Sequence, residues 1–331
     1  MPHARPASFY PWGPPLLEKI LARSWQLLEP TQAEMQPELL LPGSLNEPII
    51  QGGSRIVSNV CTHRGARLLR APCTRKNLRC PYHGRSYSPE GKLLARPGFE
   101  DAPPVQEDLP SLPLHCLGPL QFTAIQPALP FPPQLQERLS FLPWSELRLD
   151  PIATRDYTVR AHFLLYLENY LEGLHIPFVH PALNQALDWK SYRMELFPGG
   201  SLQIGLANAD GPAFDLPPGH PDHGLRVAAY WYALHPCTLL NFYPWGLSVN
   251  RLLPEGPEQT RIRYHSYVWK EELRGKGAGG ALDQVELEDD AIVEEVQLGL
   301  RSRLYRGGLL SPRWEQGVAH LHQELDSLLA E

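Results

Sequence analysis

The spacing of hydrophobic residues changes along the 331-residue chain. Between residues 48 and 118 the apolar residues form short runs, and turn-forming glycines and prolines separate these runs. Such a pattern predicts a series of β-hairpins. Further along, alternating apolar residues predict longer strands at 228–236, 238–253 and 260–269, because alternate side chains of a strand share one face.

Helical periodicity marks four other segments, which are 16–28, 161–175, 283–304 and 313–329. The third of these is rich in acidic residues, and we expect Glu294 and Glu295 on its solvated face. In the last segment we expect His320 and His322 to be exposed.

These patterns predict an α+β protein, in which an all-β domain precedes a larger domain of helices and antiparallel sheet. We place an N-terminal arm and helix at 1–40, the all-β domain at 41–118 and the larger domain at 119–331. The proline-rich segment 127–135 is interpreted as a surface spacer near the boundary.

The composition restricts the kind of protein further. The chain contains 36 prolines, about twice ordinary usage, which excludes a long helical bundle. Its 30 basic and 36 acidic residues give a net charge of −6, so no nucleic-acid partner is expected. No apolar run approaches the roughly 20 residues of a membrane helix, and no secretory signal is recognisable. Five scattered cysteines are too few for a disulfide framework, so we expect reduced thiols in a cytoplasmic protein.

Two tight Cys/His pairs lie in the predicted all-β domain. Cys61 and His63 form a Cys-x-His pair, and Cys80 and His83 form a Cys-x-x-His pair after 16 intervening residues. Two turns would bring the four ligands together. A Cys₂His₂ set can hold a structural zinc ion, although zinc sites more often pair Cys with Cys and His with His. Mixed pairs suit a Rieske [2Fe–2S] cluster, in which two cysteines bind one iron and two histidines the other.

The stretches CTHRGARLL and CPYHGRSYSPEGKL resemble the Rieske motif of ring-hydroxylating and related oxygenases. Gly65 and Gly84, which follow the two pairs, would let the backbone approach the cluster closely. Arg85 departs from the pattern, because many members of the family carry tryptophan at that position. Arg85 would therefore affect the surroundings and the reduction potential of the cluster but not its ligands.

A second group of candidate ligands lies in the segment LENYLEGLHIPFVHP. His175 and His180 are five residues apart, so on an unbroken helix their side chains would point about 140° apart and could not share a metal. Pro177 disfavours helical geometry at Ile176, so we expect the helix to end at His175 and His180 to fold back. Glu172 precedes His175 by three residues and would lie on the same face.

Two histidines with one carboxylate are typical of non-haem iron(II) oxygenases, whose iron keeps open positions for dioxygen. Alone, a His-x₄-His pair is weak evidence, because loop and core histidines also occur at this spacing. Together with the Cys/His pairs, the segment resembles the catalytic (α) subunits of Rieske non-haem iron oxygenases over residues 20–325. The resemblance implies that His175 and His180 bind the iron and that Asn169 and Glu172 belong to the same site.

The resemblance also implies an aspartate ligand late in the chain. Related sequences carry Asp followed eight residues later by Gln, and Asp289 and Gln297 have this spacing. The same segment offers Glu288 and Asp290, of which Asp290 is the main alternative. We therefore expect Asp289 to be the third iron ligand.

Such an enzyme would contain a Rieske [2Fe–2S] cluster and a mononuclear Fe(II). The resemblance implies that the cluster passes electrons one at a time to this iron. The iron would then activate dioxygen beside a small organic substrate. The chain has neither a nucleotide-binding glycine fingerprint nor a ferredoxin-type cysteine spacing, so NAD(P)H would act only through a separate reductase, in some cases with a ferredoxin. Related α subunits form homotrimers. Glu172 would then connect His175 of one subunit to His83, rather than His63, of the next.

Ring dihydroxylation, monohydroxylation and oxidative demethylation all occur on this scaffold. Glu172 stands where most of the family has aspartate, and with NFYPWGLSVN at 241–250 it resembles the branch acting on choline, carnitine and glycine betaine. A cage of aromatic rings would bind a quaternary ammonium group. The candidates for this cage are Trp231, Tyr232, Tyr243 and Trp245. Ordinary core packing on strands is the better explanation for any single one of them.

Three alternatives stay open at this point. The first is an aromatic-ring dihydroxylating dioxygenase. The others are a Rieske electron-transfer protein, which would not need the second set of ligands, and a zinc-stabilised binding protein, which would be colourless and indifferent to reductants.

Overall fold

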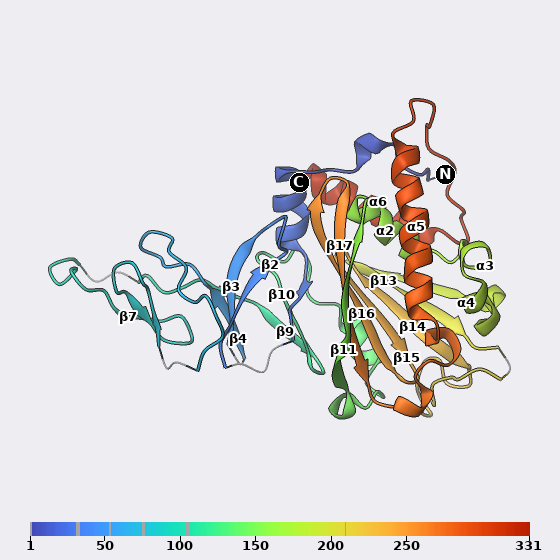
Figure 1. Ribbon diagram of the computed structural model, residues 1–331, viewed down its shortest axis with the longest axis horizontal. Helices are drawn as coiled ribbons and strands as arrows, with labels where there is room; N and C mark the ends of the chain where they lie inside the picture. Colours follow the sequence, from blue (N-terminus) through green and yellow to red (C-terminus); the bar gives the residue numbers. More distant parts are fainter. Residues whose placement is uncertain (1, 31–33, 53, 75–76, 104–105, 209) are drawn as a thin grey trace. The chain divides into compact units, whose positions relative to one another are not determined.

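The computed structural model describes the whole chain except residues 1, 31–33, 53, 75–76, 104–105 and 209. Two compact units can be distinguished (Figure 1). The smaller unit is Trp25–Pro127, and the larger unit joins the residues up to Ser24 to Ala128–Glu331. The predicted α+β fold class, with an all-β domain ahead of a helix-and-sheet domain, is confirmed. The domain bounds expected at 41–118 and 119–331 stay predictions.

The described residues of the smaller unit form strands and turns, as the hairpin pattern predicted. Three antiparallel sheets have the strand orders β2-β3-β4-β8, β1-β10-β9 and β5-β6-β7. Their strands are β1 (Gln26–Leu27), β2 (Gln36–Leu40), β3 (Glu47–Gly52), β4 (Arg55–Ser58), β5 (Leu78–Arg79), β6 (Ser86–Tyr87), β7 (Leu93–Ala95), β8 (Ser111–Leu112), β9 (Leu114–Leu117) and β10 (Leu120–Thr123).

The hydrophobic core of the smaller unit includes two of the candidate ligands. Cys61 and Cys80 pack in one buried cluster with Ile50, Val57 and Tyr87. Burial of the apolar side chains around them therefore fixes where the two thiols lie.

The larger unit is built on a seven-stranded antiparallel sheet with the order β11-β17-β16-β15-β14-β13-β12. The three stretches with alternating apolar residues all lie in this sheet. Its strands are β11 (Arg148–Val159), β12 (Arg193–Phe197), β13 (Gly200–Leu206), β14 (Val227–Leu234), β15 (Thr238–Tyr243), β16 (Gly246–Gly256) and β17 (Gln259–Val268).

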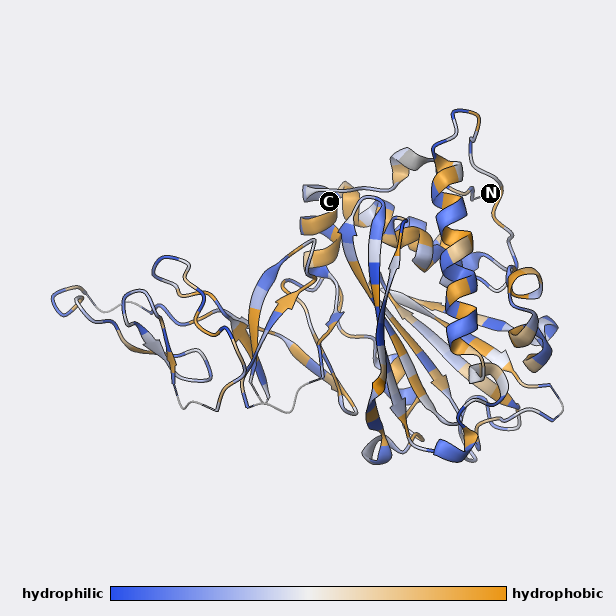
Figure 2. Ribbon diagram, viewed as in Figure 1, coloured by the Kyte–Doolittle hydropathy of each residue, from blue (hydrophilic) through white to orange (hydrophobic). Residues whose placement is uncertain are grey.

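The long helix α5 (Leu282–Leu300) lies over one face of this sheet, next to α2 (Phe163–Tyr170) (Figure 1). Hydrophilic and hydrophobic residues alternate along α5 (Figure 2), and its buried residues include Val293, Gln297 and Leu300. The other helices are α1 (Pro133–Arg138), α3 (Ile176–Val179), α4 (Pro181–Ala186), α6 (Gln316–Ala330) and the short turns η1 (Ala7–Phe9), η2 (Pro15–Ile20), η3 (Leu21–Arg23), η4 (Trp144–Glu146), η5 (Trp189–Ser191), η6 (Glu271–Leu273) and η7 (Gly277–Gly279). Within the described residues, no helix combines the length and apolar character needed to cross a bilayer.

The first predicted helix, 16–28, is shorter than its pattern suggested. The helical turns end at Arg23, and Ser24 has extended backbone. The next residues, Gln26 and Leu27, instead pair with β10 as strand β1. Strand pairing within the smaller unit thus outweighs the helical propensity of the same residues.

The expectation that the histidines of α6 are exposed is wrong. His322 is buried, and its Nε2 lies 2.9 Å from Oε1 of Glu168, whose other oxygen accepts a hydrogen bond from the Tyr10 hydroxyl at 3.1 Å. His320 is partly buried and lies 2.9 Å from the carbonyl oxygen of Phe197. A histidine side chain can be buried when its ring nitrogens form hydrogen bonds with polar groups in the core.

Candidate metal centres

Two matched turns carry the Cys/His pairs of the smaller unit. The Gly65 amide donates to the Cys61 carbonyl at 3.0 Å, and the Gly84 amide donates to the Cys80 carbonyl at 3.1 Å. The two glycines have nearly equal positive φ angles of 72° and 74°, a conformation that strongly favours glycine. The local sequence therefore builds the same loop twice.

Both thiols lie in the core of the smaller unit, with exposed fractions of 2% for Cys61 and 3% for Cys80. Burial alone would raise the pKa of Cys61. The hydroxyl of Tyr87, 3.3 Å from Sγ, and nearby backbone N–H groups outweigh it, so the pKa of Cys61 is lowered. A lowered pKa favours the thiolate, which is the form that binds iron.

The two histidines lie nearer the surface than the cysteines. The rings of His63 and His83 have their centroids 4.8 Å apart, and His83 is exposed. Nδ1 of His63 is buried and has no hydrogen-bond partner among the described residues. A buried ring nitrogen without a partner is expected where a metal completes its coordination. The four side chains therefore fit a cluster held by two inner thiolates and two outer imidazoles.

The geometry disfavours a mononuclear zinc site in the smaller unit. Four ligands of one zinc ion, each about 2.0–2.3 Å from the metal, must converge on a single point. Among the described residues, only His175, His180 and Asp289 form a group of three or more Cys, His, Asp or Glu side chains whose ligand atoms all lie within 4.8 Å of one another. The Cys/His set is more widely spaced, as the two iron positions of a [2Fe–2S] cluster require.

Arg85, the departure from the family pattern, has a buried side chain beside these turns. Its guanidinium forms an ion pair with Glu107 and lies 4.9 Å from the ring centroid of Phe99. It also approaches the Thr62 hydroxyl at 3.5 Å. A charged group thus occupies the place of an aromatic ring, with its charge balanced by a carboxylate.

In the larger unit, the chain breaks its helix earlier than predicted. Helix α2 ends at Tyr170, and His175 immediately precedes α3 while His180 follows it. Pro177 lies in the first turn of α3, so the expectation that it terminates a helix is wrong. A proline is well tolerated at the start of a helix, because the N–H group it lacks would have no helical partner there.

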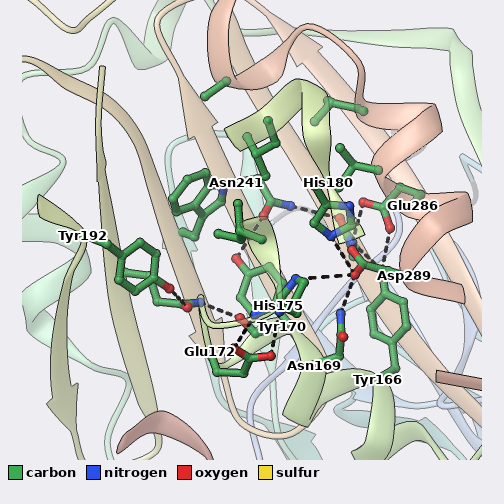
Figure 3. Close-up of a pocket in the computed structure, with 18 of the residues that line it drawn as sticks. Tyr166, Asn169, Tyr170, Glu172, His175, His180, Tyr192, Asn241, Glu286 and Asp289 are labelled. Carbon is green, nitrogen blue, oxygen red and sulfur yellow. Dashed lines mark hydrogen bonds and ion pairs between the residues drawn. The ribbon is translucent and has the colours of Figure 1, made fainter. Parts of the chain in front are cut away.

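The structure brings together the three candidate iron ligands of the larger unit (Figure 3). Nε2 of His180 lies 3.0 Å from Oδ1 of Asp289, and Nε2 of His175 lies 3.6 Å from the same oxygen. Two imidazoles and one carboxylate on one side of a cavity leave positions free for other ligands, as a facial triad requires. The alternative ligand, Asp290, is not part of this group.

Each histidine is oriented by a glutamate on its other ring nitrogen. Nδ1 of His175 lies 2.6 Å from Glu172, and Nδ1 of His180 lies 2.8 Å from Glu288. Carboxylates in these positions keep the proton on Nδ1, so the Nε2 lone pairs are free for a metal. Glu288, which sequence alone offered only as a possible ligand, has this orienting position.

Two hydrogen bonds between α2 and α5 hold Asp289 in place. Asn169 on α2 donates to Oδ1 of Asp289 at 2.5 Å. Two helical turns further along α5, Gln297 accepts a hydrogen bond of 2.9 Å from the His162 amide at the start of α2. The Asp-to-Gln spacing seen in the sequence therefore corresponds to two contacts that fix α5 against α2.

The candidate ligands line a cavity of about 80 Å³. Two of the four predicted cage residues, Trp231 and Tyr243, line it, but Tyr232 and Trp245 do not. Tyr232 follows Trp231 on β14, so its side chain points to the opposite face of the sheet. Trp245 lines a neighbouring cavity of about 440 Å³ instead.

Several lining residues were not identified from the sequence. Tyr170 and Tyr192 contribute further rings, and Asn241 accepts a hydrogen bond of 2.9 Å from the Tyr170 hydroxyl. Glu286, one turn before Asp289 on α5, contributes a further carboxyl group. The helical spacing of Glu286 and Asp289 was the only available signal, and an acidic helix face gives the same spacing.

Comparison with known families agrees with both centres. The family described as “Ring hydroxylating alpha subunit (catalytic domain)” matches residues 148–331. The family described as “Rieske [2Fe-2S] domain” matches residues 36–113. The two matches cover the catalytic and the cluster-binding parts that the motifs predicted.

Individual proteins are similar over most of the chain. The chain is 28% identical to the carnitine monooxygenase oxygenase subunit of Escherichia coli (strain K12), over 84% of this chain and 79% of the relative. It is 24% identical to the chloroplastic choline monooxygenase of Spinacia oleracea, over 95% of this chain and 74% of the relative.

Two solved structures show the same fold. The quaternary ammonium Rieske monooxygenase CntA in complex with L-carnitine superimposes with a TM-score of 0.70 at 22% identity, over 98% of this chain and 95% of that one. Naphthalene 1,2-dioxygenase from Rhodococcus sp. bound to indole gives a TM-score of 0.68 at 17% identity, over 96% and 92%.

Proposed function

Because the chain belongs to the ring-hydroxylating oxygenase α-subunit family and carries a Rieske [2Fe–2S] domain, we propose that it hydroxylates or oxidatively demethylates a small quaternary ammonium compound. The protein is an oxidoreductase of the Rieske non-haem iron oxygenase class. Its cofactors are the Rieske cluster and a mononuclear iron.

The observation that supports this substrate class is the lining of the iron pocket. The cavity is small, and aromatic rings of Tyr170, Tyr192, Trp231 and Tyr243 line it. Aromatic faces attract a cation, most strongly when water is excluded. The Trp231 indole donates to the Tyr243 hydroxyl at 3.1 Å, so these two rings keep a fixed orientation. Curated relatives that act on carnitine and choline support the same substrate class.

We assign the Rieske cluster to Cys61, His63, Cys80 and His83, and the mononuclear iron to His175, His180 and Asp289. When bound, these groups supply single electrons and activate dioxygen next to the substrate. The chain's own part is to orient both imidazoles through Glu172 and Glu288 and to hold Asp289 through Asn169. A fixed orientation of ligands and substrate, with water excluded, is what the protein adds to the chemistry of its cofactors.

Glu172 is proposed as the link between the two centres rather than as an iron ligand. One of its oxygens contacts Nδ1 of His175, and the other accepts hydrogen bonds from the backbone amides of Leu174 and His175. A carboxylate oxygen can accept two hydrogen bonds, so Oε2 is saturated by the two amides and Oε1 keeps capacity for a further donor. In a head-to-tail trimer that donor would be His83 of the neighbouring subunit.

We infer that the α subunits assemble as a homotrimer and receive electrons from a separate reductase, with or without a ferredoxin, in the cytoplasm. Exposed apolar residues on α5 support an interface with another subunit, because Leu287, Val296 and Leu298 are 53%, 45% and 52% exposed. On the smaller unit, Tyr82 is 56% exposed beside His83, which would place the cluster close to a partner.

A turnover experiment tests the proposal. Iron-loaded protein, a surrogate reductase, NADH and dioxygen are incubated with choline, carnitine and glycine betaine, and in parallel with naphthalene and simpler aromatics. We expect substrate-dependent NADH consumption and an oxidised product with at least one ammonium compound. Turnover of the aromatic compounds alone would instead support the ring-dihydroxylating alternative, since naphthalene 1,2-dioxygenase has the same fold.

A further inference from the structure

One carboxyl group in the iron pocket has no part in holding the metal. Glu172, Glu286 and Asp289 are the acidic residues that line the cavity. Glu172 contacts His175, and Asp289 lies against both histidines. Glu286 contacts neither histidine among the described residues, although Figure 3 places it on the same side of the pocket as Asp289. It is therefore free to interact with a substrate.

The Glu286 carboxyl is fixed by neutral hydrogen-bond donors. The Tyr166 hydroxyl donates to Oε2 at 2.6 Å, the Tyr264 hydroxyl donates to the same oxygen, and the Asn250 amide lies 3.3 Å from Oε1. The groups found to act on Glu286 are two hydroxyls, one amide and the carboxyl groups of Asp289 and Asp290, and none of these is basic. Three donors from α2, β16 and β17 hold the group rigidly, but none of them supplies a positive charge.

The electrostatic environment of Glu286 determines its ionisation. Burial, followed by the negative charge of Asp289, raises the pKa of Glu286 to about 8. Hydrogen bonds from Tyr166 and Tyr264 act in the opposite direction and favour the carboxylate. Iron bound at Asp289 and a cationic substrate in the cavity would both lower the pKa of Glu286 and so favour its ionised form.

We propose that Glu286 is the counter-ion of the substrate's ammonium group and sets the preference of the pocket for a cation over a neutral molecule of the same shape. This inference rests on the proposed function and names the residue that decides its specificity. Aromatic rings such as Trp231 and Tyr243 attract a cation but also pack well against its neutral carbon analogue. A fixed carboxylate adds a full negative charge to the attraction of the ring faces, so it distinguishes the two ligands more strongly by charge.

Paired ligands of equal shape test this role by binding rather than by turnover. Choline and 3,3-dimethylbutan-1-ol differ by the replacement of the quaternary nitrogen with carbon. Their affinities for the iron-loaded protein are measured by isothermal titration calorimetry without dioxygen. Since a buried carboxylate and a cation attract each other strongly at protein-like dielectric constants, we expect wild-type protein to prefer choline by about tenfold or more.

The variants separate the charge from the shape of the site. Glu286→Gln keeps the size and acceptor oxygen of the side chain, and we expect most of the choline preference to be lost. Glu286→Asp keeps the charge at a greater distance and should retain an intermediate preference. The matched control is Glu295→Gln, which removes the same charge from an exposed position of α5 and should leave the ratio unchanged.

The outcomes distinguish this inference from the proposed function. A Glu286→Gln variant with the wild-type ratio would overturn the role of Glu286 and leave the ammonium substrate class intact. Wild-type protein that binds both ligands equally, or neither, would overturn the counter-ion role, and the ammonium substrate class would fall as well only if none of the three ammonium compounds is turned over. Iron content and circular dichroism are measured for every variant. If Glu286→Gln loses iron or does not fold, the test rests on Glu286→Asp. An unchanged preference for choline in that variant would contradict the counter-ion role, because its carboxylate lies farther from the ammonium group.

Discussion

The two metal centres use histidines in different ways. The Cys/His set of the smaller unit lies within 23 residues, on two turns that repeat the same hydrogen bonds around Gly65 and Gly84. In the larger unit, 109 residues separate His180 from Asp289, and the site forms only when α5 packs against α2. The first centre is therefore a property of local sequence, and the second is a property of helix packing.

This difference predicts different sensitivities. Changes near the Cys/His turns should affect the cluster and the core of the smaller unit together, since Cys61 and Cys80 belong to both. In the larger unit, residues that touch no metal should still control metal binding, because they position the helices that carry the ligands.

The largest effect is expected from the loss of a buried thiolate ligand. Cys61→Ser should abolish the [2Fe–2S] cluster and destabilise the smaller unit, while the mononuclear iron site is retained. Visible absorption, EPR after reduction, and counts of iron and acid-labile sulfide provide the measurement. His83→Ala should give the same result, and a variant with the complete Rieske spectrum would contradict the assignment.

The complementary change affects the other centre. Asp289→Ala or His175→Ala should lose the mononuclear iron and all turnover, while the Rieske spectrum stays unchanged. Iron analysis together with EPR separates the two sites. Asp290→Ala is the matched control, because Asp290 lies outside the group of ligand atoms. Loss of iron from Asp290→Ala alone would show that the adjacent aspartate is the ligand.

A smaller effect is expected from Glu172, which would join the two centres. Glu172→Gln should keep both iron sites and the oligomer but slow electron transfer from the reduced cluster by about 10- to 100-fold, because orienting carboxylates contribute effects of that size. Stopped-flow spectroscopy of a single turnover measures the rate. The electron-transfer rate of Glu172→Asp should lie between those of the wild-type protein and Glu172→Gln. A wild-type rate in the Gln variant, or loss of its mononuclear iron, would rule out the linking role.

The smallest effect is expected from a residue that touches no ligand. Gln297→Ala removes the acceptor of the His162 amide, and an unsatisfied buried donor costs about 1–3 kcal/mol of stability. Because the same contact fixes α5, we expect weaker iron binding as well as a lower melting temperature, with the Rieske spectrum unchanged. Glu295→Ala, at an exposed position of the same helix, serves as the control. Equal iron affinity in both variants would show that Gln297 does not position Asp289.

The amino-acid sequence was sufficient to predict the all-β unit, the stretches that form β14 to β17 of the large sheet and the Cys/His turns, but not β11, β12 and β13. Each of these depends on near neighbours in the chain, such as the alternation in β14 and the positive φ of Gly65 and Gly84. Mixed Cys/His pairs on glycine turns have few alternative explanations, so their spacing is enough to indicate cluster chemistry.

The construction of the second centre depends instead on how the helices pack. Glu288 orients His180, Trp231 lines the pocket while Tyr232 does not, and His322 is buried against Glu168. None of these relationships is visible in the sequence, because a helix face can turn toward solvent or toward a partner with the same residue pattern. The contacts between α2 and α5 determine which face is buried, and they therefore determine which carboxyl groups of α5 lie beside the histidines.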